Sequence, residues 1–298
     1  MLTLASDFGT PYPAAMRGVL CRRTDARLVD VAHDFPRQDV RAAAFWLREV
    51  LPYFPPAVHL VVVDPGVGTD RKAIVVRAGE HALVGPDNGV LRPAARRLAG
   101  DDTPEYYVVD EERLESPEPA GRRSRVGREA ATPSATALRS NADSRNDGSE
   151  TGPASTTFHG RDVFAPAAGE VHEVGVEDLP DLEWLESLEG DPVDCRLPDA
   201  TFEDGDGDGG TRATGEVLVV DDFGNVITNV PGGFLADRER ILANGEAVPV
   251  GETFAAVPAG DRLATVGSHG YVELDVNQGR GDEAFGLEAG DRVKMRRV

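Results

Sequence analysis

Apolar runs of strand length alternate with segments of helical spacing over the first 110 residues of the chain. Strands are predicted at residues 2–5, 26–32, 58–63, 72–77 and 81–84. Helices are predicted at 14–22, at 40–51 and from Val163 onward. Strands that alternate with helices in this way are typical of a mostly parallel α/β sheet.

The last third of the chain has a different pattern, because short apolar segments alternate there with turn residues and show little helical period. The predicted strands are residues 215–220, 226–230, 240–242, 264–266, 271–276 and 292–295. This pattern predicts a small barrel or sandwich. The expected fold class is therefore α/β, with an N-terminal, mostly parallel α/β sheet domain and a smaller C-terminal all-β, barrel-like domain.

Two segments contain few large apolar residues and separate the ordered regions. Residues 112–156 are rich in Arg, Ser, Ala, Pro, Gly and Asn, which predicts a disordered insertion in the first domain. An acidic linker is predicted at 196–212. Its Asp-Gly repeat from Asp204 resembles a calcium loop, but the twelfth position is Gly215, where an EF-hand has glutamate. The predicted domains are therefore 1–195 and 213–298.

Composition narrows the classes of partner. The 298 residues include 31 Lys and Arg against 52 Asp and Glu, a net charge of −21 that opposes binding to nucleic acid or to anionic membranes. Such acidity is typical of a halophilic surface. Cys21 and Cys195 are far apart and form no zinc or iron–sulfur motif. With no signal segment or apolar run of ~18 residues, we expect a cytoplasmic protein with a small-molecule substrate.

One apolar run ends in residues that can carry chemistry. Asp64, followed by Pro65 and Gly66, comes directly after the predicted strand 58–63, where open α/β sheets place their ligands. Arg71 lies seven residues further, across a Gly-rich turn, and His159 comes from a distant segment. A carboxylate, a guanidinium and an imidazole would thus meet only through the fold.

Six segments in order resemble the S-adenosyl-L-methionine hydroxide adenosyltransferase family, which is related to the fluorinases and chlorinases. They cover nearly the whole chain outside the insertion and the linker. The segments are Ser6-Asp7-Phe8-Gly9, Asp30-Val31-Ala32-His33, Val63-Asp64-Pro65-Gly66-Val67-Gly68-Thr69, Gly85-Pro86-Asp87-Asn88-Gly89, Thr157-Phe158-His159-Gly160-Arg161-Asp162 and Asp222-Phe223-Gly224-Asn225-Val226-Ile227-Thr228-Asn229.

The resemblance implies hydrolysis of S-adenosyl-L-methionine to adenosine and L-methionine, by attack of water or hydroxide on the 5′ carbon of the ribose. The catalytic triad it implies is Asp64, Arg71 and His159. A carboxylate and an imidazole can accept or relay the proton, and a guanidinium stabilises hydroxide; the proton path stays open. Methionine leaves as a neutral thioether, so no cofactor and no metal are expected. The resemblance also implies a homotrimer, with each ligand between an α/β domain and a neighbouring subunit's β-domain.

The resemblance assigns polar contacts to the substrate as well. Asp7 corresponds to the carboxylate that accepts both ribose hydroxyls, and Asp221 to the residue that binds the methionine ammonium. Ser268 corresponds to a contact with the methionine carboxylate. His269 stands where the halogenating relatives have arginine, which leaves the recognition of that carboxylate open.

Adenine contacts are implied at three positions of the β-domain. Phe223 corresponds to a ring that stacks on adenine, and Asn225 to a side chain that hydrogen-bonds to it. Phe254 is a candidate for a second aromatic wall.

Four other functions are alternatives to hydrolysis. A halogenase of the same fold is the nearest, but the halogenating relatives lack the triad present here. A metal-dependent hydrolase could use Asp7, His33, Asp64 and His159, although the chain has no HExxH motif. A non-catalytic nucleoside or S-adenosyl-L-methionine binder stays open. A Rossmann methyltransferase is disfavoured because no G-x-G-x-x-G follows the first strand.

Overall fold

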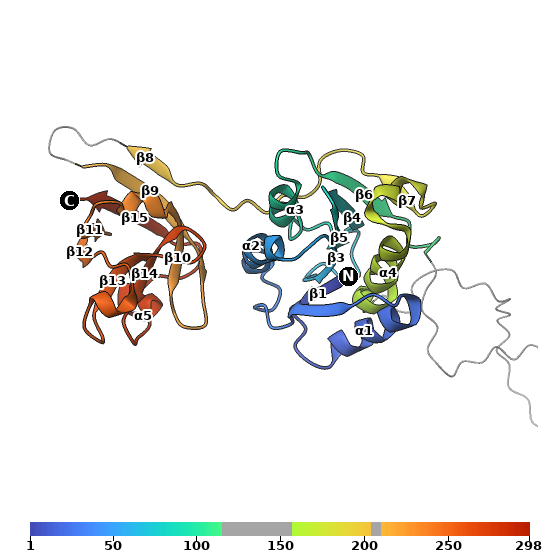
Figure 1. The fold of residues 1–298 in the computed structure, drawn as a ribbon, viewed down its shortest axis with the longest axis horizontal. Coiled ribbons are helices and arrows are strands. Elements are labelled where there is room, and N and C mark those ends of the chain that lie inside the picture. The colour runs from blue at the N-terminus through green and yellow to red at the C-terminus, as the bar shows by residue number, and fades with distance from the viewer. Residues whose placement is uncertain (115–156, 204–209) are drawn as a thin grey trace, which may run out of the picture. The chain divides into compact units, whose positions relative to one another are not determined.

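The computed structural model describes residues 1–114, 157–203 and 210–298, which form two compact units (Figure 1). Unit 1 consists of Met1–His33, Pro56–Pro86 and Glu105–Asp191, and unit 2 of Asp34–Pro55, Asp87–Pro104 and Pro192–Val298. The predicted insertion at 112–156 lies outside the described residues except for 112–114, as do residues 204–209 of the acidic linker. The division into domains 1–195 and 213–298 stays a prediction.

Unit 1 is built on a seven-stranded mixed sheet with the order β2-β1-β3-β5-β4-β6-β7. Its strands are β1 (Leu2–Ser6), β2 (Leu28–Ala32), β3 (Val58–Val62), β4 (Ala73–Ala78), β5 (His81–Pro86), β6 (Glu105–Val109) and β7 (Leu185–Ser187). Strands β2, β1, β3 and β5 are parallel neighbours, whereas β4, β6 and β7 join antiparallel. The parallel strands β1 and β3 therefore end at the same edge of the sheet.

Two helices of unit 1, α1 (Tyr12–Arg23) and α4 (Ala165–Val174), pack against each other and on the sheet (Figure 1). A π-helical turn, η2 (Gly160–Phe164), leads into α4, and a 3-10 segment, η3 (Val176–Asp181), follows it. Met16 and Leu20 of α1 are fully buried with Leu4, Leu60 and other strand residues in one apolar core. This core fixes the start of α4 relative to the strand ends.

Unit 2 contains an eight-stranded antiparallel sheet. Seven strands have the order β12-β11-β15-β9-β10-β14-β13, and the eighth, β8, pairs with β9. Its strands are β8 (Thr201–Glu203), β9 (Arg212–Val220), β10 (Val226–Pro231), β11 (Arg240–Ala243), β12 (Glu246–Pro249), β13 (Arg262–Val266), β14 (Tyr271–Val276) and β15 (Arg292–Arg297). A bridge between Val250 and Ala264 links the two ends, so the sheet is nearly a closed barrel. Fully buried aliphatic residues such as Val217, Val272 and Val293 fill it.

The helical segments of unit 2 lie outside this barrel. They are α2 (Val40–Val50), η1 (Leu51–Tyr53), α3 (Arg92–Ala99), η4 (Gly232–Leu235), η5 (Phe254–Ala256) and α5 (Gly281–Phe285). Asp39 caps α2 by accepting a hydrogen bond from the amide of Ala42 at 2.9 Å. Phe45 of α2 packs against Leu218 and Ile227 of the barrel strands.

The expected fold class is confirmed, with corrections at the level of single elements. Strand β4 runs antiparallel to β5, and α3 was not predicted because its sequence, rich in Arg and Ala, has few large apolar residues. Three residues of the predicted linker form β8.

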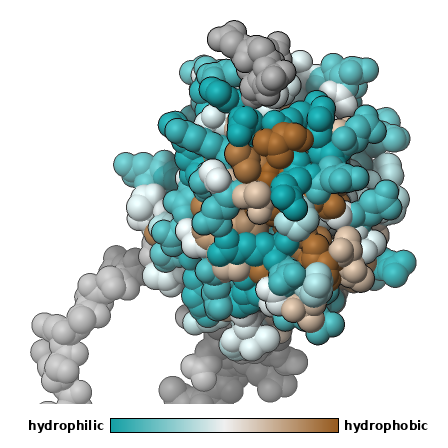
Figure 2. All heavy atoms as spheres, turned by 90° about the vertical axis from the view of Figure 1, so that its left-hand side faces the viewer, coloured by the Kyte–Doolittle hydropathy of each residue, from teal (hydrophilic) through white to brown (hydrophobic). Residues whose placement is uncertain are grey.

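The face of the barrel unit turned to the viewer in Figure 2 is largely hydrophilic, with hydrophobic side chains gathered in limited patches. In the described part of the chain, none of the helices has the length and apolar character needed to cross a membrane.

Candidate active site

The loop after β3 folds back on itself and brings Arg71 next to Asp64. The amide of Val67 donates to the carbonyl of Asp64, and Thr69 donates to the carbonyl of Gly66 through both its amide and its hydroxyl. The loop is tightly packed at Gly66, because a Cβ there would lie 3.2 Å from Cγ of Arg71. The Asp-Pro-Gly sequence thus ends the strand and forms a compact turn.

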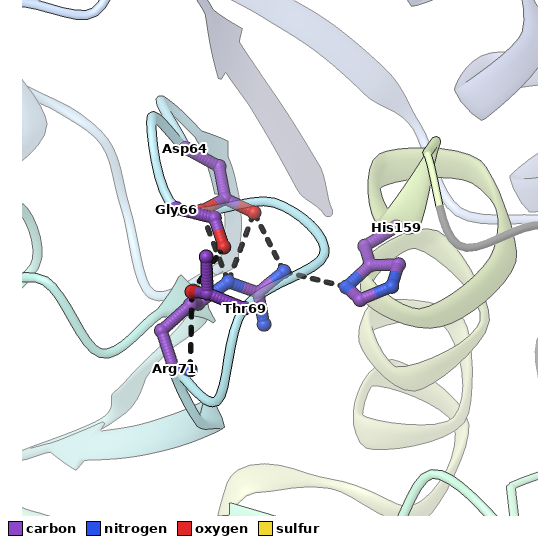
Figure 3. A network of polar contacts seen from close by, with 5 residues as sticks. All are labelled: Asp64, Gly66, Thr69, Arg71 and His159. Atoms are coloured by element: carbon purple, nitrogen blue, oxygen red, sulfur yellow. Dashed lines mark hydrogen bonds and ion pairs between the residues drawn. The ribbon is translucent and has the colours of Figure 1, made fainter.

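Asp64 and Arg71 form a bidentate ion pair (Figure 3). Arg71 Nε donates to both oxygens of Asp64, at 2.9 and 3.0 Å, and Nη2 donates to Oδ2 at 2.6 Å. The two side chains are only 4% and 8% exposed. A charge-assisted pair of this geometry is strong and holds both groups in one orientation.

His159 completes the cluster from the turn that precedes η2. Its Nδ1 lies 2.6 Å from Arg71 Nη2 (Figure 3). Because a guanidinium only donates, Nδ1 must accept, which assigns the proton of the neutral ring to Nε2. The three residues of the predicted triad are therefore brought together, with Arg71 as the link between the other two. Its Nη1 is buried and has no hydrogen-bond partner in the described residues.

A cavity of about 370 Å³, the unit 1 cavity, opens beside this cluster, and Asp64 and His159 line it. Three aromatic rings form its other wall: Phe8, Tyr12 and Phe158 pack edge to face with centroids 5.4–6.0 Å apart. Sequence reasoning did not assign these rings a role, although Phe8 and Phe158 lie within the quoted motifs. Arg71 is not part of the lining, so it acts on the cavity through its two partners.

Asp7 directly follows β1, and Ser6 pairs in register with Val62 of β3. Asp7 therefore lies at the same sheet edge as Asp64, and it is buried. His33, weighed as a metal ligand, has Nδ1 at 2.8 Å from the Ser6 hydroxyl and Nε2 at 3.1 Å from Asp30. Within the described ranges, no three His, Cys, Asp or Glu side chains are grouped so that they could hold a metal ion.

Unit 2 has a larger cavity of about 760 Å³, the barrel pocket, on the side of the barrel formed by β10, β13 and β14. Every predicted substrate residue of the β-domain lines it: Asp221, Phe223, Asn225, Phe254 and Ser268. The pocket is rich in exposed aromatic surface, since Phe223 is 78% exposed and Phe254 43%.

The turn between β9 and β10 is organised by Asp221. Its carboxylate accepts hydrogen bonds from the amides of Phe223 and Asn225 at 3.0 and 2.8 Å, and from Nδ2 of Asn225 at 2.9 Å. Gly224 has a φ of 86°, a left-handed conformation that suits glycine. This turn presents the ring of Phe223 to the pocket.

His269 also lines the barrel pocket and connects it to α2. Its ring packs edge to face on Phe45 and Trp46, and its Nδ1 lies 3.9 Å from a carboxylate oxygen of Glu49. Glu49 is buried and also pairs with Arg48 and Arg97.

Two further carboxyls of the barrel have strongly altered acidity. Burial, together with nearby Asp221, raises the pKa of Glu273 to about 7. Burial, together with Glu273 and Asp221, raises the pKa of Asp275 to about 8. Glu273 lines the pocket, and sequence reasoning missed both residues because alternation in a strand gave no sign that acids face inward.

The fold defines a class of protein with a carboxylate–guanidinium–imidazole cluster at the strand ends of an α/β unit and a second cavity on a barrel unit. The sequence matches the SAM hydroxide adenosyltransferase N-terminal domain over residues 2–148 and the C-terminal domain of the same family over 215–294. The chain belongs to the S-adenosyl-L-methionine hydroxide adenosyltransferase family. The resemblance found in the six motifs is thereby confirmed.

Similar proteins cover nearly the full length of the chain. An (R)-S-adenosyl-L-methionine hydrolase of Thermus thermophilus is 38% identical, over 97% of this chain and 97% of the relative. A protein of the same name from Salinispora tropica is 35% identical, over 99% and 97%. The crystal structure of an uncharacterized conserved protein from Thermotoga maritima is similar with a TM-score of 0.73, at 28% identity and 100% coverage of both chains.

Proposed function

We propose that this chain hydrolyses S-adenosyl-L-methionine to adenosine and L-methionine. Family membership and the names of the similar hydrolases support the reaction. The observation that carries the proposal is that Asp64 and His159 line one cavity while Arg71 bonds to both. A water molecule in that cavity would meet two groups fixed in orientation.

In the proposed mechanism Asp64 is the base and His159 orients the water. With Nδ1 of His159 occupied by Arg71, its Nε2–H donates to the water oxygen, and a carboxylate oxygen of Asp64 accepts a water proton. The oxygen attacks the ribose 5′ carbon as the carbon–sulfur bond breaks. The bonding pair goes to sulfur, so methionine leaves as a neutral thioether, and the net products include one proton.

Recognition of the nucleoside is assigned to Asp7 and, as the resemblance implies for a trimer, to the barrel pocket of a neighbouring subunit. Adenine stacks on Phe223 with Phe254 as a second wall, and Asn225 hydrogen-bonds to its edge. Asp7 accepts the ribose hydroxyls. As the resemblance implies, Asp221 binds the methionine ammonium and Ser268 contacts the methionine carboxylate.

The proposed assembly is a homotrimer with active sites at subunit interfaces, as the family resemblance implies. Light scattering of the purified protein tests it, with a mass three times the 31.8 kDa of the chain expected. A monomeric mass under assay conditions would contradict the proposal.

Product analysis tests the reaction. Purified protein is incubated with S-adenosyl-L-methionine in oxygen-18 water, with and without EDTA and with high chloride, and the products are identified by mass spectrometry. We expect adenosine and methionine in equal amounts, label in the adenosine, and no effect of EDTA. A 5′-chloro nucleoside as the main product would favour a halogenase, loss of activity in EDTA a metal hydrolase, and binding without turnover a binding protein.

A further inference from the structure

The segment Asp30-Val31-Ala32-His33 at the end of β2 carries two ionisable side chains that the proposed mechanism does not use. Strand β2 pairs with β1, and the register of the two strands shifts by one residue just before the pair of Ala5 with Ala32. Such a shift is the mark of a β-bulge, which re-aims the side chains that follow it. The next residues, Ser6 and His33, therefore lie level with each other at the end of the two strands.

His33 holds both ends of the turn that follows β1. At the start of the turn its Nδ1 lies 2.8 Å from the hydroxyl oxygen of Ser6. At the end of the turn its carbonyl accepts a hydrogen bond from the amide of Gly9 at 2.7 Å. Gly9 has a φ of 62°, a left-handed conformation that suits glycine and turns the chain back toward His33. Only Asp7 and Phe8 lie between the two points of attachment.

Asp30 determines which nitrogen of His33 carries the proton. Its Oδ1 lies 3.1 Å from Nε2, an electrostatic contact without the alignment of a hydrogen bond. Nε2 is protonated, because a lone pair there would face a negative charge. In the neutral ring Nδ1 is then the acceptor, and the hydroxyl of Ser6 donates to it. Asp30 also forms an ion pair with Arg17 of α1, so the contacts join β1, β2 and α1.

The hydrogen bond between Ser6 and His33 is the best shielded contact of this chain. Ser6 is fully buried, and the side chain of His33 is only 17% exposed. A buried hydroxyl that loses its acceptor keeps the cost of its lost hydration, so this bond resists opening. The side chains of Arg17 and Asp30 are 37% and 39% exposed, and an ion pair so open to solvent contributes little. We therefore expect the turn to depend on His33 more than on the ion pair.

The two residues between the points of attachment are those that meet a ligand in the proposed function. Asp7 is buried at the sheet edge that carries the catalytic cluster. Phe8 lines the unit 1 cavity, and its ring packs on those of Tyr12 and Phe158. One carboxylate accepts two neighbouring hydroxyls only from a narrow range of positions, so a displacement of the turn would weaken that contact.

We infer that His33 is a positioning residue for the ribose: by holding the turn from Ser6 to Gly9, it places the carboxylate of Asp7 where that group accepts both hydroxyls of a ribonucleoside. The inference rests on the proposed function, which assigns the ribose hydroxyls to Asp7. His33 does not line the unit 1 cavity and acts only through the turn. Selection of ribonucleosides over nucleosides without these hydroxyls then depends on a residue that the ligand does not touch.

Calorimetric titration of the full chain with adenosine and with 2′,3′-dideoxyadenosine tests the inference. The two nucleosides differ only in the ribose hydroxyls, and we expect the native chain to bind adenosine more tightly. His33→Ala should weaken the binding of adenosine by about 5- to 20-fold, because the turn loses a buried hydrogen bond. The affinity for 2′,3′-dideoxyadenosine should stay unchanged, so the two affinities approach each other.

Two further variants separate positioning from general damage. Ser6→Ala removes the same hydrogen bond from the other side, so it should weaken adenosine binding as much as His33→Ala does. The double variant should weaken it no further, because both changes break one interaction. His33→Asn keeps an acceptor close to the place of Nδ1 and should restore most of the lost affinity.

The matched control is His81→Ala, which should change neither affinity. His81 begins β5 at the opposite edge of the same sheet, where its ring bonds to His59. Equal weakening of both nucleosides by His33→Ala and Ser6→Ala would indicate general damage and overturn the inference. Unchanged affinity for adenosine in these variants would overturn it too, and so would a native chain that binds both nucleosides equally. Where His33→Ala does not fold, Ser6→Ala decides the inference alone.

Hydrolysis of S-adenosyl-L-methionine is measured on the same preparations. A chain that hydrolyses this substrate, but whose preference for adenosine survives His33→Ala and Ser6→Ala, keeps the proposed function and loses the inference. A chain whose preference depends on His33 as expected, but which releases no adenosine from S-adenosyl-L-methionine, keeps the inference and loses the proposed function.

Discussion

The unit 1 cavity and the barrel pocket differ in whether their acidic side chains have hydrogen-bond partners. In unit 1, Asp64 is held by three hydrogen bonds from Arg71, which also holds His159. In the barrel pocket, Glu273 is nearly as well buried but has no partner in the described residues. In one cavity the charged groups are held in place by one another, and in the other a buried carboxyl has no partner in the described residues.

This contrast separates two physical tasks. A group that activates water must be held in position before the reaction, because reorganisation during the reaction raises the barrier. A group that recognises an ion gains specificity when it is unsatisfied without that ion. We therefore expect substitutions in the unit 1 cavity to change kcat, and substitutions in the barrel pocket to change KM.

The largest effect is expected for Asp64→Asn. The amide keeps the size of the side chain but cannot accept a proton from water, so kcat should fall by about 10²- to 10⁴-fold with little change in KM. Release of adenosine from S-adenosyl-L-methionine, followed by chromatography, measures both constants.

The control is Asp70→Asn, an exposed acid on the same loop, which should retain activity. A rise in KM with normal kcat for Asp64→Asn would place this residue in recognition and remove the contrast between the two cavities.

A smaller effect is expected for Phe223→Ala, and it should fall on KM rather than on kcat. Stacking of a base on an aromatic ring contributes about 1–3 kcal/mol, so KM should rise by about 10- to 100-fold while kcat is retained at saturation. Phe202→Ala is the control, since this ring is half exposed on β8 of the same unit and lies outside the barrel pocket. Equal effects of the two substitutions would count against adenine stacking on Phe223.

The parts of the site that sequence could predict are those encoded in short motifs. The apolar run before Asp64 and the Pro-Gly after it predict a strand end, and the structure places β3 at Val58–Val62. The motif around His159 predicted the third member of the cluster, and its ring lies 2.6 Å from Arg71. The direction of that contact was not predictable, because only the geometry shows that Nδ1 accepts and that Arg71 lies outside the cavity lining.

The residues that sequence missed depend on which face of an element is buried. The segment around Tyr12 has few apolar residues, so its sequence does not predict a cavity wall. In the structure the Tyr12 ring packs against Phe158, which comes from a distant part of the chain. Glu273 and Asp275 alternate with apolar residues in β14, a pattern that normally predicts an exposed acidic face. In the structure α5 packs against β14, and both acids are buried.

The buried acid behind the pocket gives an effect on stability rather than on catalysis or binding. The folded-state pKa of Asp275, about 8, lies above the ordinary value of 3.8, so the folded state binds this proton more tightly than the unfolded chain does. Below pH 4 both states hold the proton and the group has no effect on the pH dependence. As pH rises from 4 to 8, the unfolded state ionises first, and the free energy of unfolding falls.

The side chain created by Asp275→Asn cannot ionise, so the stability of this variant relative to the native chain should increase across this pH window, by about 2–5 kcal/mol in total. Urea unfolding at pH 4, 6 and 8 measures the difference, with the exposed Asp237→Asn as control. A difference that is the same at all three pH values would mean that Asp275 is ionised in the folded protein and has found a partner, which would weaken the contrast between the paired Asp64 and the unpaired carboxyls of the barrel.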